Sequence, residues 1–314
     1  MRNLFSMLRG HRPPPADEQK TPREATEIRS AHPNGHFYSP VVDPEELRAK
    51  ADRIWPTEAG EVAGIDFNDA YHAYVLDQLF PEFFGDFDYA DHGPEDEHLT
   101  QFYVQNPQFS WLDARLLFVL LRAWKPARIM EVGSGYSTLL MTDVNRRFLG
   151  GSTQIVAIEP YPRSFLAQLR GQIELIEQRV QDVAPETFLQ LEAGDVLFID
   201  SSHVMKTGSD VNYLYFEILP RLKPGVRVHV HDIFLPAEYP VEWVLDDNRS
   251  WNEQYLLRAL LMFSTRFRVL FGSKYAYLKH RDRLSAALRI AREHCFGGAS
   301  LWFEVTEAHT LGQP

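Results

Sequence analysis

From Trp111 onward the sequence alternates short apolar runs with stretches of helical spacing. This alternation is typical of a parallel sheet whose strands are joined by crossover helices. We therefore predict an α/β fold, with a Rossmann-like sheet and helices on both of its faces. Helices are expected at residues 111–124 and 137–148. Strands are expected at residues 128–132, 154–159, 173–176, 195–200, 226–232, 267–271 and 300–305.

The chain before this alternation differs in texture and divides into two further regions. Residues 1–30 are rich in Pro and charge, which predicts a flexible leader. Residues 31–108 contain helical stretches and aromatic loops without strand alternation, which predicts an N-terminal helical and loop lid or cap. Residues 109–314 are then expected to form the ligand-binding domain.

Composition excludes several classes of partner. Asp and Glu number 43 against 32 Lys and Arg, a formal net charge of -11, so nucleic acid and anionic membranes are unfavourable partners. No apolar run approaches the roughly 20 residues that cross a bilayer. Cys295 is the single cysteine and cannot form an internal disulfide, which is consistent with a reducing cytoplasm. A homo-oligomer remains open at this stage.

The strand expected at residues 128–132 runs into Glu131-Val132-Gly133-Ser134-Gly135, an E-x-G-x-G turn that opens the next helix. Glycines let the backbone approach a ligand closely, and a helix start offers unpaired N–H groups. A dinucleotide fingerprint would have a third glycine at position 138, where this chain has Thr138. The turn therefore favours a nucleoside that carries no pyrophosphate.

Acidic residues follow the next two strands. Glu159 ends the second strand, where a carboxylate can accept hydrogen bonds from both ribose hydroxyls of a nucleoside. Asp182 follows the third strand and is a candidate partner for an adenine amino group. These residues and the glycine turn together indicate a nucleoside site over the tips of the first strands.

With these residues the sequence resembles the class I S-adenosylmethionine-dependent methyltransferases over about residues 111–305. Their first motif is an acidic residue followed by x-G-x-G, and their second strand ends in Asp or Glu. The resemblance implies the class I methyltransferase sheet and S-adenosylmethionine as cofactor. Tyr136 has two interpretations, packing on the cofactor or packing between helix and sheet. The candidate cofactor-binding residues are Glu131, Gly133, Ser134, Gly135, Tyr136, Ser137, Glu159, Pro160, Asp182 and Asp200.

Two later strands also end in polar clusters, Asp200-Ser201-Ser202-His203 and His231-Asp232. If these strands are parallel neighbours, about 4.8 Å apart, Asp200 and Asp232 converge and repel each other unless a cation or a proton lies between them. A metal site at Asp200 and Asp232 is therefore expected. The alternative is that Asp200 only hydrogen-bonds the following loop. His229 lies deeper on its strand and is expected to be a core residue.

Methyl transfer to a hydroxyl group requires removal of its proton. His203, three residues after Asp200, is the candidate catalytic base, because imidazole titrates near neutral pH. The sequence resembles the metal-dependent O-methyltransferases of the catechol and macrocin types, which carry an Asp after the fourth strand and an acidic pair after the fifth. His231 replaces one member of that pair, so the resemblance implies a metal site at Asp200, His231 and Asp232. The resemblance thus implies Mg²⁺ first, with Mn²⁺, Fe²⁺ and Zn²⁺ left open by the histidines.

Aromatic residues are expected near the mouth of this site. The loop at residues 231–240, followed by Trp243 and Trp251, supplies the walls that a small organic acceptor needs. Residues 102–111 and the His36-Phe37-Tyr38 segment are expected to close over the site, although lid packing explains them equally well.

The sequence thus predicts S-adenosylmethionine-dependent methyl transfer to a small-molecule hydroxyl, with catalytic roles for Asp200 and His203 and with a divalent cation. Three alternatives remain open: metal-independent or N-methyl transfer, iron-dependent oxidation on the same scaffold, and a non-catalytic nucleoside-binding protein.

Overall fold

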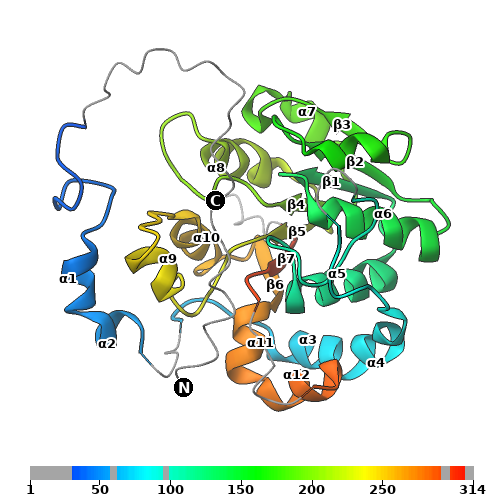
Figure 1. The fold of residues 1–314 in the computed structure, drawn as a ribbon, viewed down its shortest axis with the longest axis horizontal. Coiled ribbons are helices and arrows are strands. Elements are labelled where there is room, and N and C mark those ends of the chain that lie inside the picture. Colours follow the sequence, from blue (N-terminus) through cyan, green and yellow to red (C-terminus); the bar gives the residue numbers. More distant parts are fainter. Residues whose placement is uncertain (1–29, 57–61, 95–98, 291–297, 308–314) are drawn as a thin grey trace, which may run out of the picture.

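A seven-stranded sheet lies at the centre of the molecule (Figure 1). The computed structural model describes residues 30–56, 62–94, 99–290 and 298–307. Within them the strand order is β3-β2-β1-β4-β5-β7-β6. The strands are β1 (Arg128–Val132), β2 (Gln154–Ile158), β3 (Glu174–Ile176), β4 (Val196–Ile199), β5 (Arg227–Val230), β6 (Phe267–Gly272) and β7 (Leu301–Val305).

The central strands are apolar because helices cover both faces of the sheet. β1 pairs in parallel with β2 and β4, and β4 pairs in parallel with β5. All four residues of β4 are buried, as are the last four of β1. Strands buried on both faces form continuous apolar runs, which is why the sequence pattern located them within one or two residues. Their parallel order brings the ends of β1, β2, β4 and β5 to one edge.

One strand departs from the parallel arrangement: β7 pairs antiparallel with both β5 and β6. Gly272, at the end of β6, is paired with Leu301, at the start of β7. The chain between them therefore returns to the same edge of the sheet that it left, and β7 runs back from there. Apolar spacing reports burial and not strand direction, so the sequence could not reveal this reversal.

Helices on the two faces build two hydrophobic cores. On one face α5 (Trp111–Trp124) and α6 (Tyr136–Phe148) contribute Leu117, Phe118 and Leu140. On the other face α10 (Glu253–Leu261) and the segment after α8 contribute Leu257 and Leu214. The other helical elements that follow α6 in the described chain are distributed over both faces. They are η5 (Ser164–Leu169), η6 (Val180–Asp182), α7 (Pro185–Phe188), α8 (Asp210–Tyr213), η7 (Leu214–Ile218), η8 (Leu219–Arg221), α9 (Val241–Leu245), α11 (Ser273–Lys279) and α12 (Arg281–Leu288).

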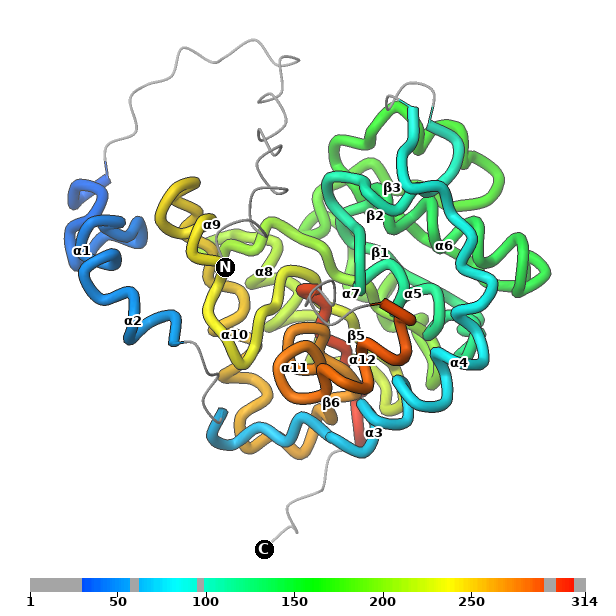
Figure 2. The backbone as a smooth tube through the Cα atoms, turned by 60° about the horizontal axis from the view of Figure 1, so that its bottom comes forward, coloured from blue at the N-terminus to red at the C-terminus, as the bar shows by residue number. Residues whose placement is uncertain are grey.

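The N-terminal region contacts the domain in two separate places. α1 (Pro44–Arg48) and α2 (Ala51–Ile54) lie beside α9 at one side of the molecule (Figure 2). Arg48 there pairs with Asp246 at 2.7 Å. The later elements pack against α5, α12 and β6 on the flank of the sheet. They are α3 (Asp69–Tyr74), η2 (Val75–Leu79), α4 (Phe80–Phe83) and η3 (Phe84–Asp86).

Two expectations fall outside the described residues: the leader, apart from Ser30, and Cys295. The division into a lid at 31–108 and a domain at 109–314 stays a prediction. Within the described ranges, no helix is both long enough and apolar enough to span a membrane.

His72, on α3, is a fully buried imidazole that packs against the end of β6. Its Nε2 accepts a hydrogen bond from the backbone N–H of Gly272 at 2.9 Å, and its Nδ1 lies 3.2 Å from the Asn68 carbonyl oxygen. The ring stacks on Phe271. Nε2 must therefore be unprotonated in the native state. Burial is the main cause that lowers the pKa of His72 to about 4, and nearby His280 acts in the same direction.

This pKa predicts a loss of stability in mild acid. Because the native pKa lies below the unfolded value, the unfolded chain takes up a proton first, and stability is lost as pH falls from about 6.5 through about 4. Between pH 7 and pH 4, we expect the free energy of unfolding of His72→Gln to decrease by about 3 kcal/mol less than that of the wild-type protein. Urea unfolding of both proteins at each pH measures it. Identical decreases in the two proteins would contradict the assignment.

Candidate active site at the strand tips

The glycine turn after β1 lies directly against the end of β4. Gly133 has φ of +82°, and a Cβ built on it would lie 1.8 Å from the backbone oxygen of Asp200. Its N–H donates to the Ile158 carbonyl oxygen at 3.0 Å. The turn is therefore confined between the tips of β2 and β4, and only glycine fits at this position.

Glu131 lies beneath this turn and connects it to α6. Its two carboxylate oxygens accept hydrogen bonds from the hydroxyls of Ser137 and Thr138, each at 2.6 Å. Thr138 Oγ1 also accepts from the Gly135 N–H at 2.9 Å. Burial raises the pKa of Glu131 to about 7, against the lowering effect of the two hydroxyls. Glu131, through Ser137 and Thr138, thus holds the shape of the turn from inside the core.

Glu159 connects the glycine turn to the loop that follows β2. Its Oε2 accepts from the Ser134 N–H at 3.3 Å, and its Oε1 accepts from the Tyr161 N–H at 2.8 Å. Burial raises the pKa of this carboxyl. Glu159 remains partly exposed at the strand tip, the position expected of a ribose-binding carboxylate. Tyr136, in contrast, is buried between Tyr103 and Phe165.

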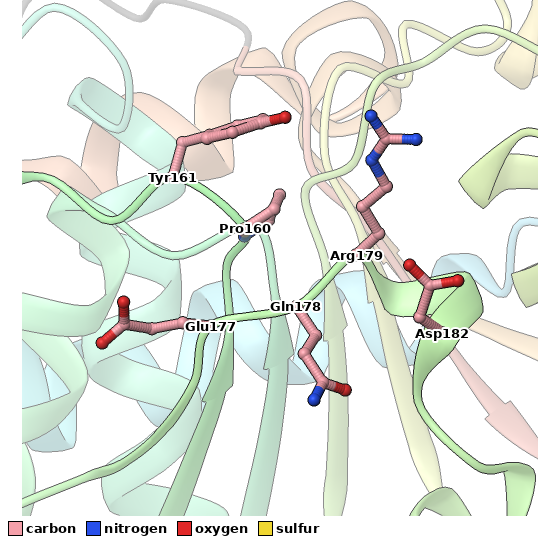
Figure 3. Close-up of a pocket in the computed structure, with 6 residues that line it drawn as sticks. All are labelled: Pro160, Tyr161, Glu177, Gln178, Arg179 and Asp182. Atoms are coloured by element: carbon pink, nitrogen blue, oxygen red, sulfur yellow. The ribbon is translucent and has the colours of Figure 1, made fainter. Parts of the chain in front are cut away.

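A hollow of about 610 Å³ opens beside Glu159, between the loops after β2 and β3 (Figure 3). Pro160 and Asp182, both predicted from sequence, line it, as do Tyr161 and Arg179. Its volume lies in the range of small-molecule sites. The residues at the tips of β1, β2 and β3 therefore fit a nucleoside.

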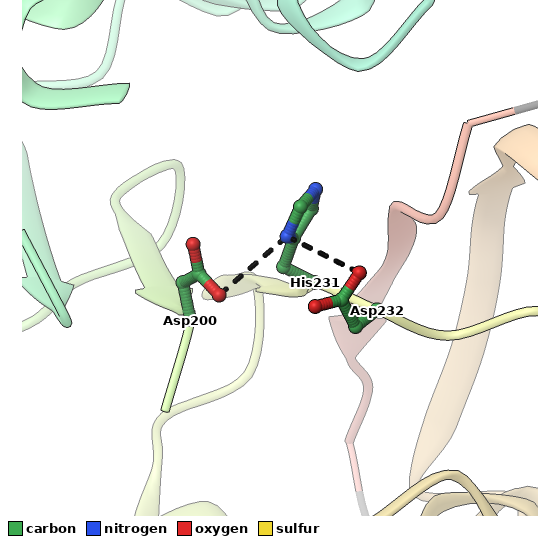
Figure 4. Close-up of side chains that lie close together, drawn as sticks. All are labelled: Asp200, His231 and Asp232. Carbon is green, nitrogen blue, oxygen red and sulfur yellow. Dashed lines mark ion pairs between the residues drawn. The ribbon is translucent and has the colours of Figure 1, made fainter. Parts of the chain in front are cut away.

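The predicted metal residues converge at the tips of β4 and β5 (Figure 4). One ligand atom from each of Asp200, His231 and Asp232 lies within 4.8 Å of the others. His231 Nδ1 is 3.5 Å from Asp200 Oδ1 and 3.8 Å from Asp232 Oδ1. This set of two carboxylates and one imidazole fits a divalent cation.

His203 lies on the other side of the same two carboxylates. Its Nε2 is 3.4 Å from Asp200 Oδ1 and 3.4 Å from Asp232 Oδ2. Its Nδ1 is 2.9 Å from Glu253 Oε2, and Glu253, at the start of α10, is fully buried. The backbone carbonyl of His203 accepts hydrogen bonds from the N–H groups of Asn252 and Glu253. This segment therefore fixes both the ring and the backbone of His203.

Both His203 and Asp232 have left-handed backbone conformations, with φ of +62° and +55°. Such conformations are costly for residues other than glycine and persist where the surroundings hold them. At this site they direct side chains of two successive loops toward one point.

Charges within the cluster control its pKa values. Burial lowers the pKa of His203, but its hydrogen bonds to Asp200 and Glu253 and the charge of Asp232 raise it to about 10. Burial likewise raises the pKa of Asp200, but His231 and His203 hold it below its usual value. The carboxylates and imidazoles of the cluster thus form a network of ion pairs among themselves.

A second buried carboxylate, Asp113 on α5, lies behind His231. Its Oδ2 is 3.4 Å from His231 Nε2. Sequence reasoning missed both Asp113 and Glu253, because nothing in an apolar helix such as 111–124 shows that one acidic residue faces a histidine more than 100 positions away. The signal that the sequence did offer was an acidic residue, Asp113, in the first turn of an otherwise apolar helix.

The remaining predicted residues divide into those near the cluster and those away from it. Trp251 packs on His203 with ring centroids 4.5 Å apart, and Trp243 packs on Trp251. Phe109 packs against His231, with ring centroids 5.2 Å apart. Phe37 and Tyr38 are exposed and do not close over the site in this structure. His229 is a core residue as predicted, hydrogen-bonded to Ser300 and stacked on Phe198.

The fold and these strand tips define a class I S-adenosylmethionine-dependent methyltransferase. A family model described as a methyltransferase domain matches residues 130–233, which contain the glycine turn, Glu159 and the polar cluster. The chain therefore contains a methyltransferase domain, as the sequence resemblance predicted.

Individual relatives give the following similarities. An uncharacterised protein of Archaeoglobus fulgidus is 36% identical over 170 residues, which cover 53% of this chain and 76% of that protein. A methyltransferase structure from Geobacter sulfurreducens is 14% identical, covers 85% of this chain and 98% of its own, and gives a TM-score of 0.38. The structure of an O-methyltransferase from Bacillus cereus in complex with S-adenosylhomocysteine is 14% identical. The match covers 77% of this chain and 98% of that chain, with a TM-score of 0.36.

Proposed function

We propose that this methyltransferase transfers the methyl group of S-adenosylmethionine to a hydroxyl group of a small molecule, with a divalent cation held by Asp200, His231 and Asp232. The observation that carries the proposal is the convergence of these three residues and His203 beside the glycine turn. Carboxylate and imidazole donors at neighbouring strand tips suit a site where an acceptor oxygen is bound and deprotonated.

A bound S-adenosylmethionine would supply the methyl group from its sulfonium, and a divalent cation held by Asp200, His231 and Asp232 would supply positive charge beside an acceptor oxygen that loses its proton. The acceptor oxygen forms the new bond to the methyl carbon as the carbon–sulfur bond breaks. His203 accepts the hydroxyl proton at Nε2, the nitrogen that faces the cluster. Glu253 accepts a hydrogen bond from Nδ1–H of the same ring, which leaves Nε2 as the basic atom.

The raised pKa of His203 is compatible with this role. Three carboxylates cause it, those of Asp200, Glu253 and Asp232. A cation held by Asp200 and Asp232 would neutralise two of them, and the ring would then be free to accept a proton. Trp251, which covers the face of His203, limits access of water to the ring.

The cosubstrate side of the proposal rests on the turn and the hollow. Gly133, Ser134 and Gly135 would lie along the methionine and ribose portions, with Glu131 and Ser137 supporting them. Glu159 would accept the ribose hydroxyls, while Pro160 and Asp182 would border the adenine. Asp200 would lie between the cosubstrate and acceptor sites, because its backbone contacts the turn and its side chain faces the cation site.

Replacement of His203 tests the proposed base. We expect His203→Gln to lower kcat by about 10²–10⁴-fold, because an amide cannot accept the proton. Affinity for S-adenosylhomocysteine, measured by calorimetry, should stay unchanged, since His203 lies at the acceptor end of the site.

Glu253→Gln provides the matched comparison, because it keeps the ring and removes only its anionic partner. Its kcat should fall less than that of His203→Gln, with the KM for S-adenosylmethionine retained. Transfer of a labelled methyl group to a panel of hydroxyl-bearing metabolites is the assay. Full turnover in His203→Gln would remove the base from the proposal.

A further inference from the structure

We infer that the cation site of this methyltransferase selects a first-row transition-metal ion over Mg²⁺, and that Asp113 is the residue that orients the ligand His231 for it. The inference rests on the proposed function, since it concerns the same site, and it names the chemical class of the ion.

The donor set is the first argument. His231 contributes a ring nitrogen, Nδ1, that faces Asp200 and Asp232 at 3.5 and 3.8 Å. Mg²⁺ prefers an octahedral shell of oxygen atoms and keeps several waters. Imidazole nitrogen instead raises affinity for Mn²⁺, Fe²⁺, Co²⁺ and Zn²⁺. A histidine at this position therefore favours the transition metals.

The second argument is how firmly His231 is held. Its Nε2 faces Asp113 Oδ2, and Asp113 is itself fixed by three donors. Ser273 Oγ donates to Asp113 Oδ1 at 2.7 Å, the N–H of Ser300 donates to the same atom at 3.1 Å, and the N–H of Ala299 donates to Oδ2 at 2.8 Å. The carboxylate cannot turn away from the ring.

The consequence concerns which ring nitrogen is available. A carboxylate behind one nitrogen fixes the tautomer with the proton at Nε2 and leaves Nδ1 as a basic ligand atom. Ligating histidines in metalloproteins have this outer partner as a rule. Gly298 leaves space for the Asp113 carboxylate, because a Cβ at position 298 would lie 2.2 Å from Asp113 Oδ1.

The third argument is charge. Four carboxylates, those of Asp113, Asp200, Asp232 and Glu253, surround two imidazoles. Even with both rings protonated, two negative charges remain. Among the described residues, no Lys or Arg forms an ion pair with any of the four. Buried charge of this kind is costly without a counterion, and a divalent cation offsets two of the negative charges.

The site also keeps an opening. The Asp200 and Asp232 side chains are 23% and 13% exposed, whereas those of Asp113 and Glu253 are 6% and 0% exposed. The two inner carboxylates are sealed inside the protein, and the two ligand carboxylates border solvent. An ion at this position therefore has free coordination positions on the side from which an acceptor would approach.

Metal binding, measured without any turnover, tests the inference. Protein stripped with a chelator is titrated calorimetrically with MgCl₂, MnCl₂ and ZnCl₂ in separate experiments. We expect Mn²⁺ and Zn²⁺ to bind at least about tenfold more tightly than Mg²⁺. Pulsed electron paramagnetic resonance of the Mn²⁺ form should show coupling to a histidine nitrogen.

Two variants assign the preference to particular residues. Asp113→Asn should weaken Mn²⁺ and Zn²⁺ binding by about 10–100-fold, because the amide no longer fixes the ring. His231→Glu creates an all-carboxylate set and should move the preference toward Mg²⁺. Asp69→Asn is the matched control, since it alters an Asp–His pair, with His280 at 2.8 Å, that lies away from the cluster.

The outcomes separate this inference from the proposed function. Equal affinity of the wild-type protein for Mg²⁺ and Mn²⁺ would overturn the inference and leave cation-assisted methyl transfer intact. Binding of none of the three ions would overturn both. If Asp113→Asn does not fold, the wild-type affinity ratio and its change in His231→Glu still decide the question.

Discussion

Replacement of Asp200 by Asn is expected to abolish methyl transfer while the protein stays folded and still binds S-adenosylhomocysteine. The carboxylate is the group shared by both halves of the cluster, since its Oδ1 faces His203 at 3.4 Å and His231 at 3.5 Å. An amide of the same size preserves packing but removes the charge that we propose holds a cation. We expect kcat to fall by about 10³-fold or more.

Chelation provides the second measurement for this prediction. Wild-type protein treated with EDTA should lose turnover to a similar extent and regain it when a divalent metal is added, whereas Asp200→Asn should not respond to metal. Asp246→Asn, which alters an exposed aspartate paired with Arg48, is the control and should retain full activity. Full turnover of both EDTA-treated protein and Asp200→Asn on the same acceptor would remove the cation from the mechanism.

Much of the fold could be predicted because the central strands of this sheet are buried on both faces. β1 and α5 begin and end where the sequence indicated, and the other strands differ by one or two residues at an end. Strand tips could be located for the same reason. Once β1, β2, β4 and β5 are parallel neighbours, Gly133, Glu159, Asp200 and Asp232 must come to one edge of the sheet.

Contacts made by residues far apart in the sequence could not be predicted in this way. Asp113 precedes β1 and Glu253 follows β5, yet each holds a histidine of the cluster from behind. Which acidic residue of a helix faces a given loop depends on the rotation and tilt of that helix, and apolar spacing fixes these only to within about a residue. The carboxylates that hold the two histidines could therefore be identified only from the structure.

Glu131 illustrates a different limit. Its motif indicates a cofactor site, and the turn does lie where that motif predicts. In the structure, however, its carboxylate accepts two hydroxyl hydrogen bonds from the first turn of α6. The motif correctly locates the turn, but a residue in a motif can act by shaping the backbone that meets the ligand. A sequence alone does not separate these two roles.

The turn itself gives the second large expected effect. Gly133→Ala should destabilise the protein by roughly 3–5 kcal/mol and abolish binding of S-adenosylhomocysteine. Two penalties combine at this position. The backbone has φ of +82°, which an L-residue tolerates poorly, and the new Cβ would lie 1.8 Å from the Asp200 carbonyl oxygen. Because that atom belongs to the backbone, relief of the clash must displace the tip of β4 and with it the Asp200 side chain.

Two glycine variants separate these penalties. Gly150→Ala has φ of +65° and no neighbour within 4 Å, so it should cost about 1 kcal/mol from backbone strain alone. Gly135→Ala lies in the same turn but meets only Gln108 Oε1 at 3.6 Å, and its stability should change by less than about 1 kcal/mol. Urea unfolding of all three variants measures the series. A Gly133→Ala protein as stable as Gly150→Ala would mean that the turn can move away from β4. The close contact between the glycine turn and the strand that carries Asp200 would then not be what aligns the cosubstrate and acceptor sites.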